Sequence, residues 1–343
     1  MSRRYPEWTI DGQDWPNHAA SRFVEADHYK WHVQRMGPKK KGAPVCLLIH
    51  GTGAATHSWR DLMPLLAEEY DVIAMDLPGH GFTRPTSARQ VSLPKMAASI
   101  GLLLEEMEAY PALVVGHSAG AAIGLQLMLD KCWKNPLVGL NPALMPFPGL
   151  AAKLFPQLAK MLFTNPLVSR IFARWARYPG ETSKFLRRSS GSRIDAAGAL
   201  YYGRLFSHSG HCDGAIRMMA NWRLEDLQGR LPDIDQPVML VHGQHDSAIP
   251  RSAVQRAAEQ IPRCVIEEVA NLGHLAHEED PERLADLIRQ KRPLTRPKAR
   301  RASRRFRPIA RVSAIAAAEC EGHRIPGPVR AASCRAACSG SPD

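Results

Sequence analysis

The sequence has no long apolar run: no stretch reaches the roughly 18 consecutive apolar residues that suggest a membrane-spanning helix. The N-terminus, MSRRYPEWTIDGQDWP, also has no apolar segment of the kind found in secretory signal peptides. We therefore expect neither a membrane span nor export, and a cytoplasmic location. Cysteines are few and scattered, and we expect Cys46, Cys132 and Cys264 to be reduced and packed as small hydrophobic side chains.

The sequence offers little support for nucleic-acid binding, although the net charge is +12. Residues 291–343 carry 13 Lys and Arg against three acidic residues, which accounts for +10 of that charge and leaves +2 for the first 290 residues. The tail is rich in Arg, Ala, Pro and Ser, and we expect it to be disordered. We assign it no function. Its cysteines form no complete zinc-ligand set, so no metal site and no cofactor is expected.

Apolar runs alternate with helical patterns along most of the chain. Residues 21–36 read as an antiparallel hairpin, and strand-like apolar runs follow at residues 45–49, 72–75, 113–115, 137–140, 238–241 and 265–269. Helical patterns fall at residues 59–69, 93–107, 119–131, 252–260 and 281–290. This order predicts an α/β fold with an eight-stranded, mostly parallel sheet and helices on both faces.

The alternation stops in the middle of the chain. We divide the chain into an N-terminal arm (1–20), a core (21–142 and 227–290), an inserted helical cap (143–226) and the tail (291–343). Residues 131–180 contain no acidic residue but carry Lys and Arg among apolar side chains. The cap helices could simply pack on the core with their cations in water. Contact with a membrane surface or with an acidic, apolar ligand is the alternative.

Three polar residues occupy positions that suit nucleophilic catalysis. Ser118 lies in Gly-His-Ser-Ala-Gly between a predicted strand and a predicted helix, the context of a nucleophile elbow. A serine needs a base, and His274 follows the last predicted strand. Asp246 follows the strand before it and would orient His274. The order Ser, Asp, His predicts a catalytic triad.

The loop His50-Gly51-Thr52-Gly53 follows the first apolar strand and predicts half of an oxyanion hole. The backbone N–H groups of Thr52 and Ala119 would face the developing negative charge. We also take seven residues as candidates for the walls of a substrate pocket, although aromatic and Met residues at helical spacing equally suit an ordinary core: His50, Gly51, His117, Tyr201, Phe206, Met219 and Trp222.

These motifs, together with Asp-Leu-Pro-Gly-His-Gly at residues 76–81, resemble the α/β-hydrolase superfamily over about residues 20–290. A narrower likeness is carried by SRFVEADHYKWHVQRMG, HGTGAATHSWRDLMPLLA, GHSAGAAIGLQLML, VGLNPALMPF, GSRIDAAGALYYGRLF, MMANW and NLGHLAHEEDPE. These segments resemble the BchO family of magnesium-chelatase accessory proteins in bacteriochlorophyll biosynthesis.

The resemblance implies an accessory role where Mg²⁺ is inserted into protoporphyrin IX, beside the chelatase subunits, in the cytoplasm or peripheral to photosynthetic membranes. The chain has no P-loop and so would not drive that step with ATP. The triad implies a serine hydrolase acting on a hydrophobic ester or acyl compound, and by analogy with this pathway that compound would be a tetrapyrrole ester. The alternatives are a non-catalytic porphyrin carrier or chaperone, and a general carboxylesterase unrelated to pigment synthesis.

Overall fold

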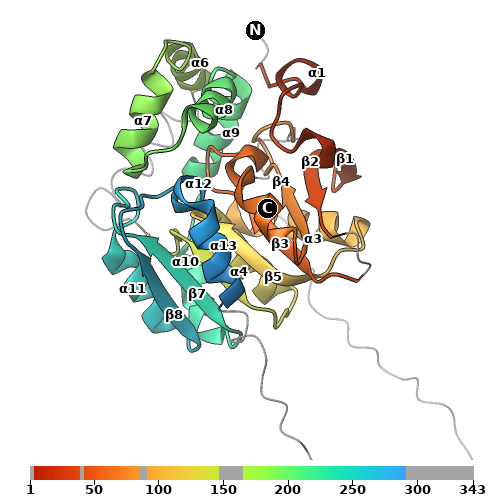
Figure 1. Cartoon of the computed structure of the whole chain (residues 1–343), viewed down its shortest axis with the longest axis vertical. Coiled ribbons are helices and arrows are strands. Elements are labelled where there is room, and N and C mark those ends of the chain that lie inside the picture. The colour runs from red at the N-terminus through yellow and green to blue at the C-terminus, as the bar shows by residue number, and fades with distance from the viewer. Residues whose placement is uncertain (1–3, 39–41, 85–90, 147–164, 291–343) are drawn as a thin grey trace, which may run out of the picture. The chain divides into compact units, whose positions relative to one another are not determined.

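The computed structural model describes residues 4–38, 42–84, 91–146 and 165–290. Within these residues one sheet of eight strands has the order β1-β2-β4-β3-β5-β6-β7-β8 (Figure 1). Its strands are β1 (Ser21–Ala26), β2 (Tyr29–Met36), β3 (Val45–Ile49), β4 (Asp71–Met75), β5 (Pro111–His117), β6 (Leu137–Leu140), β7 (Val238–Gly243) and β8 (Cys264–Val269). The first two strands form the predicted hairpin, and β2 pairs antiparallel with β4. From β4 to β8 all pairs are parallel, which confirms the predicted mostly parallel sheet.

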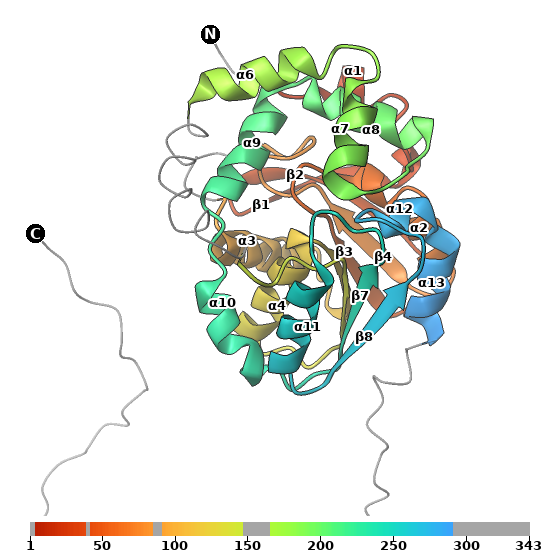
Figure 2. The same cartoon turned by 90° about the vertical axis from the view of Figure 1, so that its left-hand side faces the viewer.

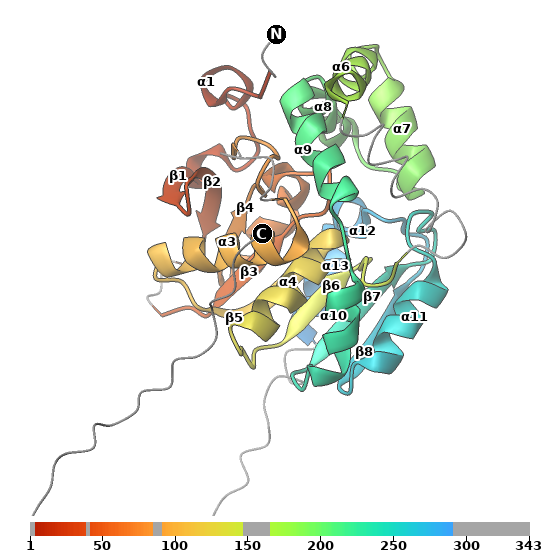
Figure 3. The same ribbon diagram turned by 180° about the vertical axis from the view of Figure 1, so that it is seen from behind.

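Helices fill the connections between the strands and cover both faces of the sheet (Figures 1 and 3). The α-helices are α1 (Trp8–Asp11), α2 (Leu62–Leu66), α3 (Leu93–Glu106), α4 (Ala119–Asp130), α6 (Pro166–Trp175), α7 (Glu181–Ser190), α8 (Ala196–Phe206), α9 (Ser209–Ala220), α10 (Glu225–Arg230), α11 (Arg251–Gln260), α12 (Ala276–Glu279) and α13 (Pro281–Gln290). Short 3₁₀ turns are η1 (His18–Ala20), η2 (Thr56–Trp59) and η4 (Leu231–Asp233).

The apolar strands are continuous because both of their faces are buried. In β3, Leu47 and Ile49 belong to the core that includes α3, α4 and α11. Cys46 and Leu48 point to the opposite core, which includes α2 and α13. Each such fully buried side chain contributes about 1.5–3 kcal/mol. A strand exposed on one face would instead alternate apolar and polar residues.

Two local expectations were wrong. The helix expected at residues 59–69 is divided into η2 and the short helix α2. Pro64 has no N–H and is tolerated only in the first turn of a helix, so α2 cannot extend far in the N-terminal direction. Cys132 is exposed and not packed in a core, because α4 ends at Asp130 and Cys132 adopts the left-handed region (φ 54°) of the following turn.

The cap region holds α6, α7, α8 and α9, which lie together beyond one end of the strands of the sheet (Figure 2). A small core of cap residues such as Phe206 and Leu186 also includes Ala54 and Leu275, from the loops after β3 and β8. Those loops leave the carboxyl ends of parallel strands, where α/β folds bind ligands. Residues 147–164 of the predicted cap and the predicted tail lie outside the described residues.

The N-terminal arm bridges the core and the cap. Trp15 is buried and its indole N–H donates to Thr56 Oγ1 at 3.0 Å. On the cap side, the guanidinium of Arg204 pairs with Asp14, and the N–H of Gly210 donates to the carbonyl of Arg4 at 2.7 Å. No helix among the described residues is long and apolar enough to cross a membrane.

Candidate active site

Ser118 stands in a sharp turn between β5 and α4. Its backbone has φ 52° and ψ −116°, a conformation that costs a non-glycine residue roughly 1–3 kcal/mol. The turn is held because the Ser118 N–H donates to the Leu140 carbonyl at 2.9 Å. A Cβ on Gly120 would lie 2.0 Å from the carbonyl oxygen of Ile49, so this position requires glycine. The half-buried Ser118 side chain is thereby held at the end of the sheet.

His274 and Asp246 form the second part of the site. Nδ1 of His274 lies 2.8 Å from Oδ2 of Asp246, and the Asp246 side chain is completely buried. The other carboxylate oxygen accepts the N–H groups of Ala248 and Ile249 at 2.8 and 2.9 Å. Because an ionised carboxylate only accepts, Nδ1 of His274 carries the proton and Nε2 is left as the basic nitrogen.

The surroundings of Asp246 favour its ionised form. Burial raises the pKa of this carboxyl, but the hydrogen bonds from His274, from Ile249 and from Asn141 Nδ2 (2.7 Å) outweigh it. The net pKa lies below its ordinary value, so the carboxyl is charged near neutral pH. A charged Asp246 would stabilise an imidazolium on His274 during proton transfer.

Two contacts bring the loop that carries His274 beside Ser118. Nε2 of His117, the residue before Ser118, donates to the carbonyl of His274 at 3.0 Å, and the two rings lie 4.8 Å apart. From the cap, the turn after α7 also holds this loop, since the Ser190 carbonyl accepts the His274 N–H at 2.9 Å and Ser192 Oγ accepts the Leu275 N–H at 2.7 Å. The hydroxyl of Ser118 makes no hydrogen bond within the described residues.

The loop after β3 presents an uncommitted backbone donor. The N–H of Thr52 makes no hydrogen bond to another described residue, and neither does the N–H of Ala119, the first residue of α4. The carbonyls on either side of Thr52 are fixed: that of Gly51 accepts Nδ1 of His50 at 2.7 Å, and that of Gly53 accepts Nε2 of His211 at 3.1 Å. This arrangement suits an oxyanion hole whose donors are oriented in advance.

His211, on α9, ties the cap to this loop and was not singled out from the sequence. Its Nδ1 accepts the N–H of Gly81 at 3.0 Å while its Nε2 donates to Gly53. Burial lowers the pKa of His211 to about 4, so the ring is neutral at physiological pH. Its ring packs edge-on to that of His80, which packs in the same way against His50. No local sequence pattern distinguishes a cap histidine of this kind.

The pocket candidates occupy different environments. His50 is fully buried with both ring nitrogens committed, since its Nε2 accepts the Leu77 N–H at 2.9 Å. Phe206 lies against the oxyanion loop, 3.6 Å from the place of a Cβ on Gly53. Tyr201 donates to the Asp14 carbonyl at 3.0 Å. Met219 is 52% exposed.

The remaining candidates lie nearer the core. Trp222 is partly buried and packs against the larger core. Gly51 lies close to Ser118, because a Cβ on it would stand 2.9 Å from Nδ1 of His117 and 3.1 Å from the Cβ of Ser118. The structure therefore brings Gly51, His117 and Phe206 close to Ser118, to His274 and to the loop after β3.

A buried ion pair behind the site also escaped sequence reasoning. The Arg60 guanidinium, after η2, contacts Oε2 of Glu278 on α12 at 2.5 Å and Oδ1 of Asp195 before α8 at 2.9 Å. Oε1 of Glu278 accepts the hydroxyls of Ser58 (2.6 Å) and Tyr202 (2.8 Å). Burial raises the pKa of Glu278 despite these donors. The pair links the cap to the turn after η2 and to the helix that follows His274.

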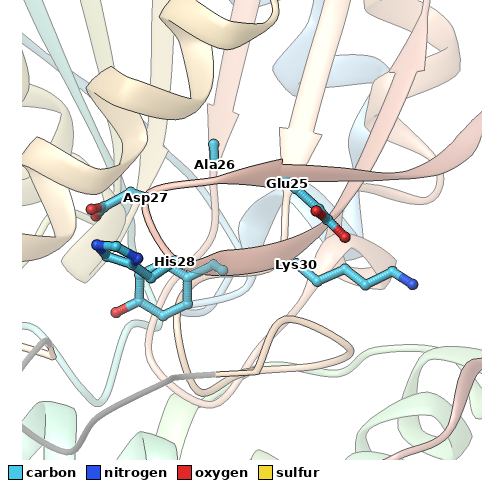
Figure 4. Close-up of a pocket in the computed structure, with 6 residues that line it drawn as sticks. Glu25, Ala26, Asp27, His28 and Lys30 are labelled. Atoms are coloured by element: carbon cyan, nitrogen blue, oxygen red, sulfur yellow. The ribbon is translucent and has the colours of Figure 1, made fainter.

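Other features of the described residues do not join the site. A surface hollow lies at the β1–β2 turn, lined by Glu25, Ala26, Asp27, His28, Tyr29 and Lys30 (Figure 4). It is at the edge of the sheet, and β2, β4 and β3 separate its outer strand β1 from β5. The described residues contain no cluster of three or more His, Cys, Asp or Glu that could hold a metal ion.

Comparison with known proteins places the chain in a family. Residues 46–287 match the alpha/beta hydrolase family. The magnesium-chelatase 30 kDa subunit of Rhodobacter capsulatus is 40% identical over 279 residues, which are 80% of this chain and 95% of that protein. The uncharacterized hydrolase YugF of Bacillus subtilis is 27% identical, over 72% of this chain and 89% of its own length.

Solved structures show the same fold. An alpha/beta hydrolase fold protein from Burkholderia ambifaria has a TM-score of 0.64 and 22% identity, covering 78% of this chain and 97% of that one. Carboxylesterase CesB of Bacillus subtilis has a TM-score of 0.62 and 19% identity, covering 82% and 94%. The chain belongs to the alpha/beta hydrolase family and, within it, to the family of the magnesium-chelatase 30 kDa subunit.

Proposed function

We propose that this protein is a serine hydrolase acting on a hydrophobic ester or related acyl compound, as an accessory protein at the magnesium-chelatase step of bacteriochlorophyll biosynthesis. The observation that carries the catalytic proposal is the combination of the strained Ser118 with the buried Asp246–His274 pair, which is held together at 2.8 Å. Strained backbone is retained mainly where function requires it. The accessory role is supported by the 40% identity to a protein named as a magnesium-chelatase subunit.

The reaction would proceed by acyl transfer. Oγ of Ser118 attacks the acyl carbon while Nε2 of His274 takes the hydroxyl proton. The carbonyl oxygen becomes negative and is held by the N–H groups of Thr52 and Ala119. His274 then returns the proton to the departing alcohol. Water, activated by the same histidine, releases the acid and restores Ser118.

The pathway gives a candidate substrate class. In the setting of magnesium insertion, we propose a tetrapyrrole ester or another large apolar compound as the ligand, with chelatase subunits as protein partners. Phe206 beside the oxyanion loop would supply apolar contact near the reacting carbon. We propose a cytoplasmic protein that works at the surface of photosynthetic membranes, and no role in nucleic-acid binding.

Covalent labelling tests the proposal. A serine-directed fluorophosphonate probe is expected to modify the wild-type protein and the control variant Ser189→Ala, whose serine lies on the exposed side of α7. It should leave Ser118→Ala unmodified. Protoporphyrin IX is expected to slow the labelling if the pocket accepts tetrapyrroles. A folded wild-type protein that resists the probe would refute the hydrolase.

A porphyrin carrier is the second candidate, and the basic character of the cap favours it because porphyrin propionates are acidic. Residues 165–193 carry seven Arg and Lys against one Glu. A carrier would bind protoporphyrin IX equally in wild type and Ser118→Ala, with no labelling and no turnover. Fluorescence quenching of the two proteins by protoporphyrin IX measures this directly. A general carboxylesterase would label at Ser118 but show no protection by porphyrin.

A further inference from the structure

The helices α6 and α7 form the outer part of the cap. Figure 2 shows α6 lying across the end of the cap that is turned away from the sheet. One side of this pair is already buried, since Ala173, Ala176 and Leu186 pack with Phe206 in the small core of the cap. The two helices are therefore already packed on the cap core through one side, and folding does not require apolar residues on the opposite side.

That opposite side nevertheless carries large apolar residues. Leu167 is 55% exposed and Ile171 is 61% exposed. The two are four residues apart on α6 and so lie on one face of the helix. Tyr178, just beyond α6, is 59% exposed. A solvent-facing surface would ordinarily present polar residues at these positions. Phe185 on α7 does not belong to this outer side, because its ring packs against those of Phe172 and Phe206.

The same segment is strongly basic. Residues 165–193 contain six Arg and one Lys against Glu181 alone, a balance of +6. Glu181 is itself paired with Lys184 at 2.8 Å. The exposed guanidinium groups of Arg174 and Arg187 make no hydrogen bond or ion pair within the described residues. The exposed apolar side chains of α6 thus share their face with Arg174, three residues after Ile171, whose guanidinium has no anionic partner among the described residues.

We propose that the outer face of α6, made of Leu167, Ile171, Arg174 and Tyr178, docks on the surface of an anionic phospholipid bilayer. Phosphate headgroups complement the cations, and the interfacial acyl region accepts the apolar side chains. A helix of ten residues cannot span a bilayer, so the contact is interfacial. The proposal deepens the proposed function, because a hydrophobic substrate would be met at such a surface, but docking itself does not require the triad.

The docked face is connected, through α7, to the loop that carries His274. The turn that ends α7 provides the Ser190 carbonyl and the Ser192 hydroxyl that hold the N–H groups of His274 and Leu275. A membrane-bound cap would therefore stay anchored to the site and would place the pocket near the bilayer. For each variant, labelling of Ser118 can therefore be measured separately from membrane binding.

Vesicle flotation of the full chain tests the proposal. Vesicles of phosphatidylglycerol and phosphatidylcholine are compared with vesicles of phosphatidylcholine alone. The double variant Leu167→Asp/Ile171→Asp is expected to lose about tenfold or more in partition to the anionic vesicles, because both apolar contact and charge balance are changed. The matched control Leu102→Asp/Tyr110→Asp changes two exposed apolar residues elsewhere (43% and 70% exposed) and is expected to lose less than about twofold.

The control separates the cap from the basic residues 291–343, which are present in every protein compared. Equal partition of the two double variants would overturn the proposal, as would a wild-type protein that does not float with anionic vesicles. If the face instead binds an acidic protein, the wild-type protein would not float with anionic vesicles. Fluorophosphonate labelling of Ser118 in each variant reports the triad separately. Vesicle binding without labelling would refute the proposed hydrolase activity and would leave the docking proposal intact.

Discussion

The substitution Glu278→Gln tests how much the buried ion pair contributes to stability. Glu278 is fully buried at its side chain and contacts Arg60, whose side chain is 6% exposed. The change keeps the shape and one carbonyl oxygen, which can still accept the hydroxyls of Ser58 and Tyr202. What is removed is the negative charge beside a buried guanidinium, and the oxygen that accepts from Arg60 is replaced by an amide NH2 group, which can only donate.

The size of the effect follows from the remaining partners of Arg60. Removing one member of a buried ion pair costs about 3–5 kcal/mol, because the other charge is left without compensation. Arg60 keeps Asp61 at 3.1 Å and Asp195 at 2.9 Å, and these carboxylates are 49% and 59% exposed. Two features place the expected loss at the lower end, about 3 kcal/mol. These carboxylates compensate in part, and the raised pKa of Glu278 shows that burial already opposes its charge. This is a large share of the 5–15 kcal/mol typical of a folded domain.

Urea denaturation followed by tryptophan fluorescence measures the loss. Trp59 is a suitable reporter, because its ring lies 4.6 Å from that of His277, the residue before Glu278. Glu106→Gln, at an exposed position at the end of α3, is the matched control and should change the free energy of unfolding by less than about 0.5 kcal/mol. Tyr202→Phe should cost about 1 kcal/mol through one hydrogen bond. A loss below about 1 kcal/mol for Glu278→Gln would refute the reasoning.

Three further outcomes are expected. Asp246→Asn should slow fluorophosphonate labelling by about 10³–10⁴-fold, since the amide no longer fixes the tautomer of His274; a rate within tenfold of wild type contradicts this. Gly120→Ala should prevent folding or labelling because its Cβ would lie 2.0 Å from a backbone carbonyl, whereas Gly229→Ala, with open space around it, should do neither, as circular dichroism and labelling will show. The free energy of unfolding should be constant above the ordinary His pKa of about 6.5 and should fall as the pH drops towards 4. The reason is that histidines of the unfolded chain bind protons in this range, whereas the buried His211 (pKa about 4) and His277 (pKa about 3) stay neutral in the folded protein. Urea midpoints that do not change between pH 7 and 4.5 would exclude this.

The sequence by itself determined the sheet and most of its helices. Apolar runs such as residues 45–49 and 137–140 matched β3 and β6 residue for residue, because strands buried on both faces leave an uninterrupted apolar signal. The elbow was equally readable, since Gly120 and Ser118 must follow a strand in a fixed spacing. Asp246 and His274 were found because each follows a strand whose carboxyl end lies at the same edge of the sheet.

Only the tertiary structure decided which residues support those motifs. Arg60 and Glu278 are 218 residues apart, and nothing local distinguishes them from exposed charges until the fold buries them together. His211 holds the carbonyl of Gly53 from the cap, across 158 residues of chain. Met219 was predicted by the same helical spacing as Phe206, yet it is exposed while Phe206 is buried beside that loop. Local patterns record what a backbone segment requires, whereas burial and long-range partners depend on how the cap and core pack, because that packing decides which polar groups lose water and must find one another.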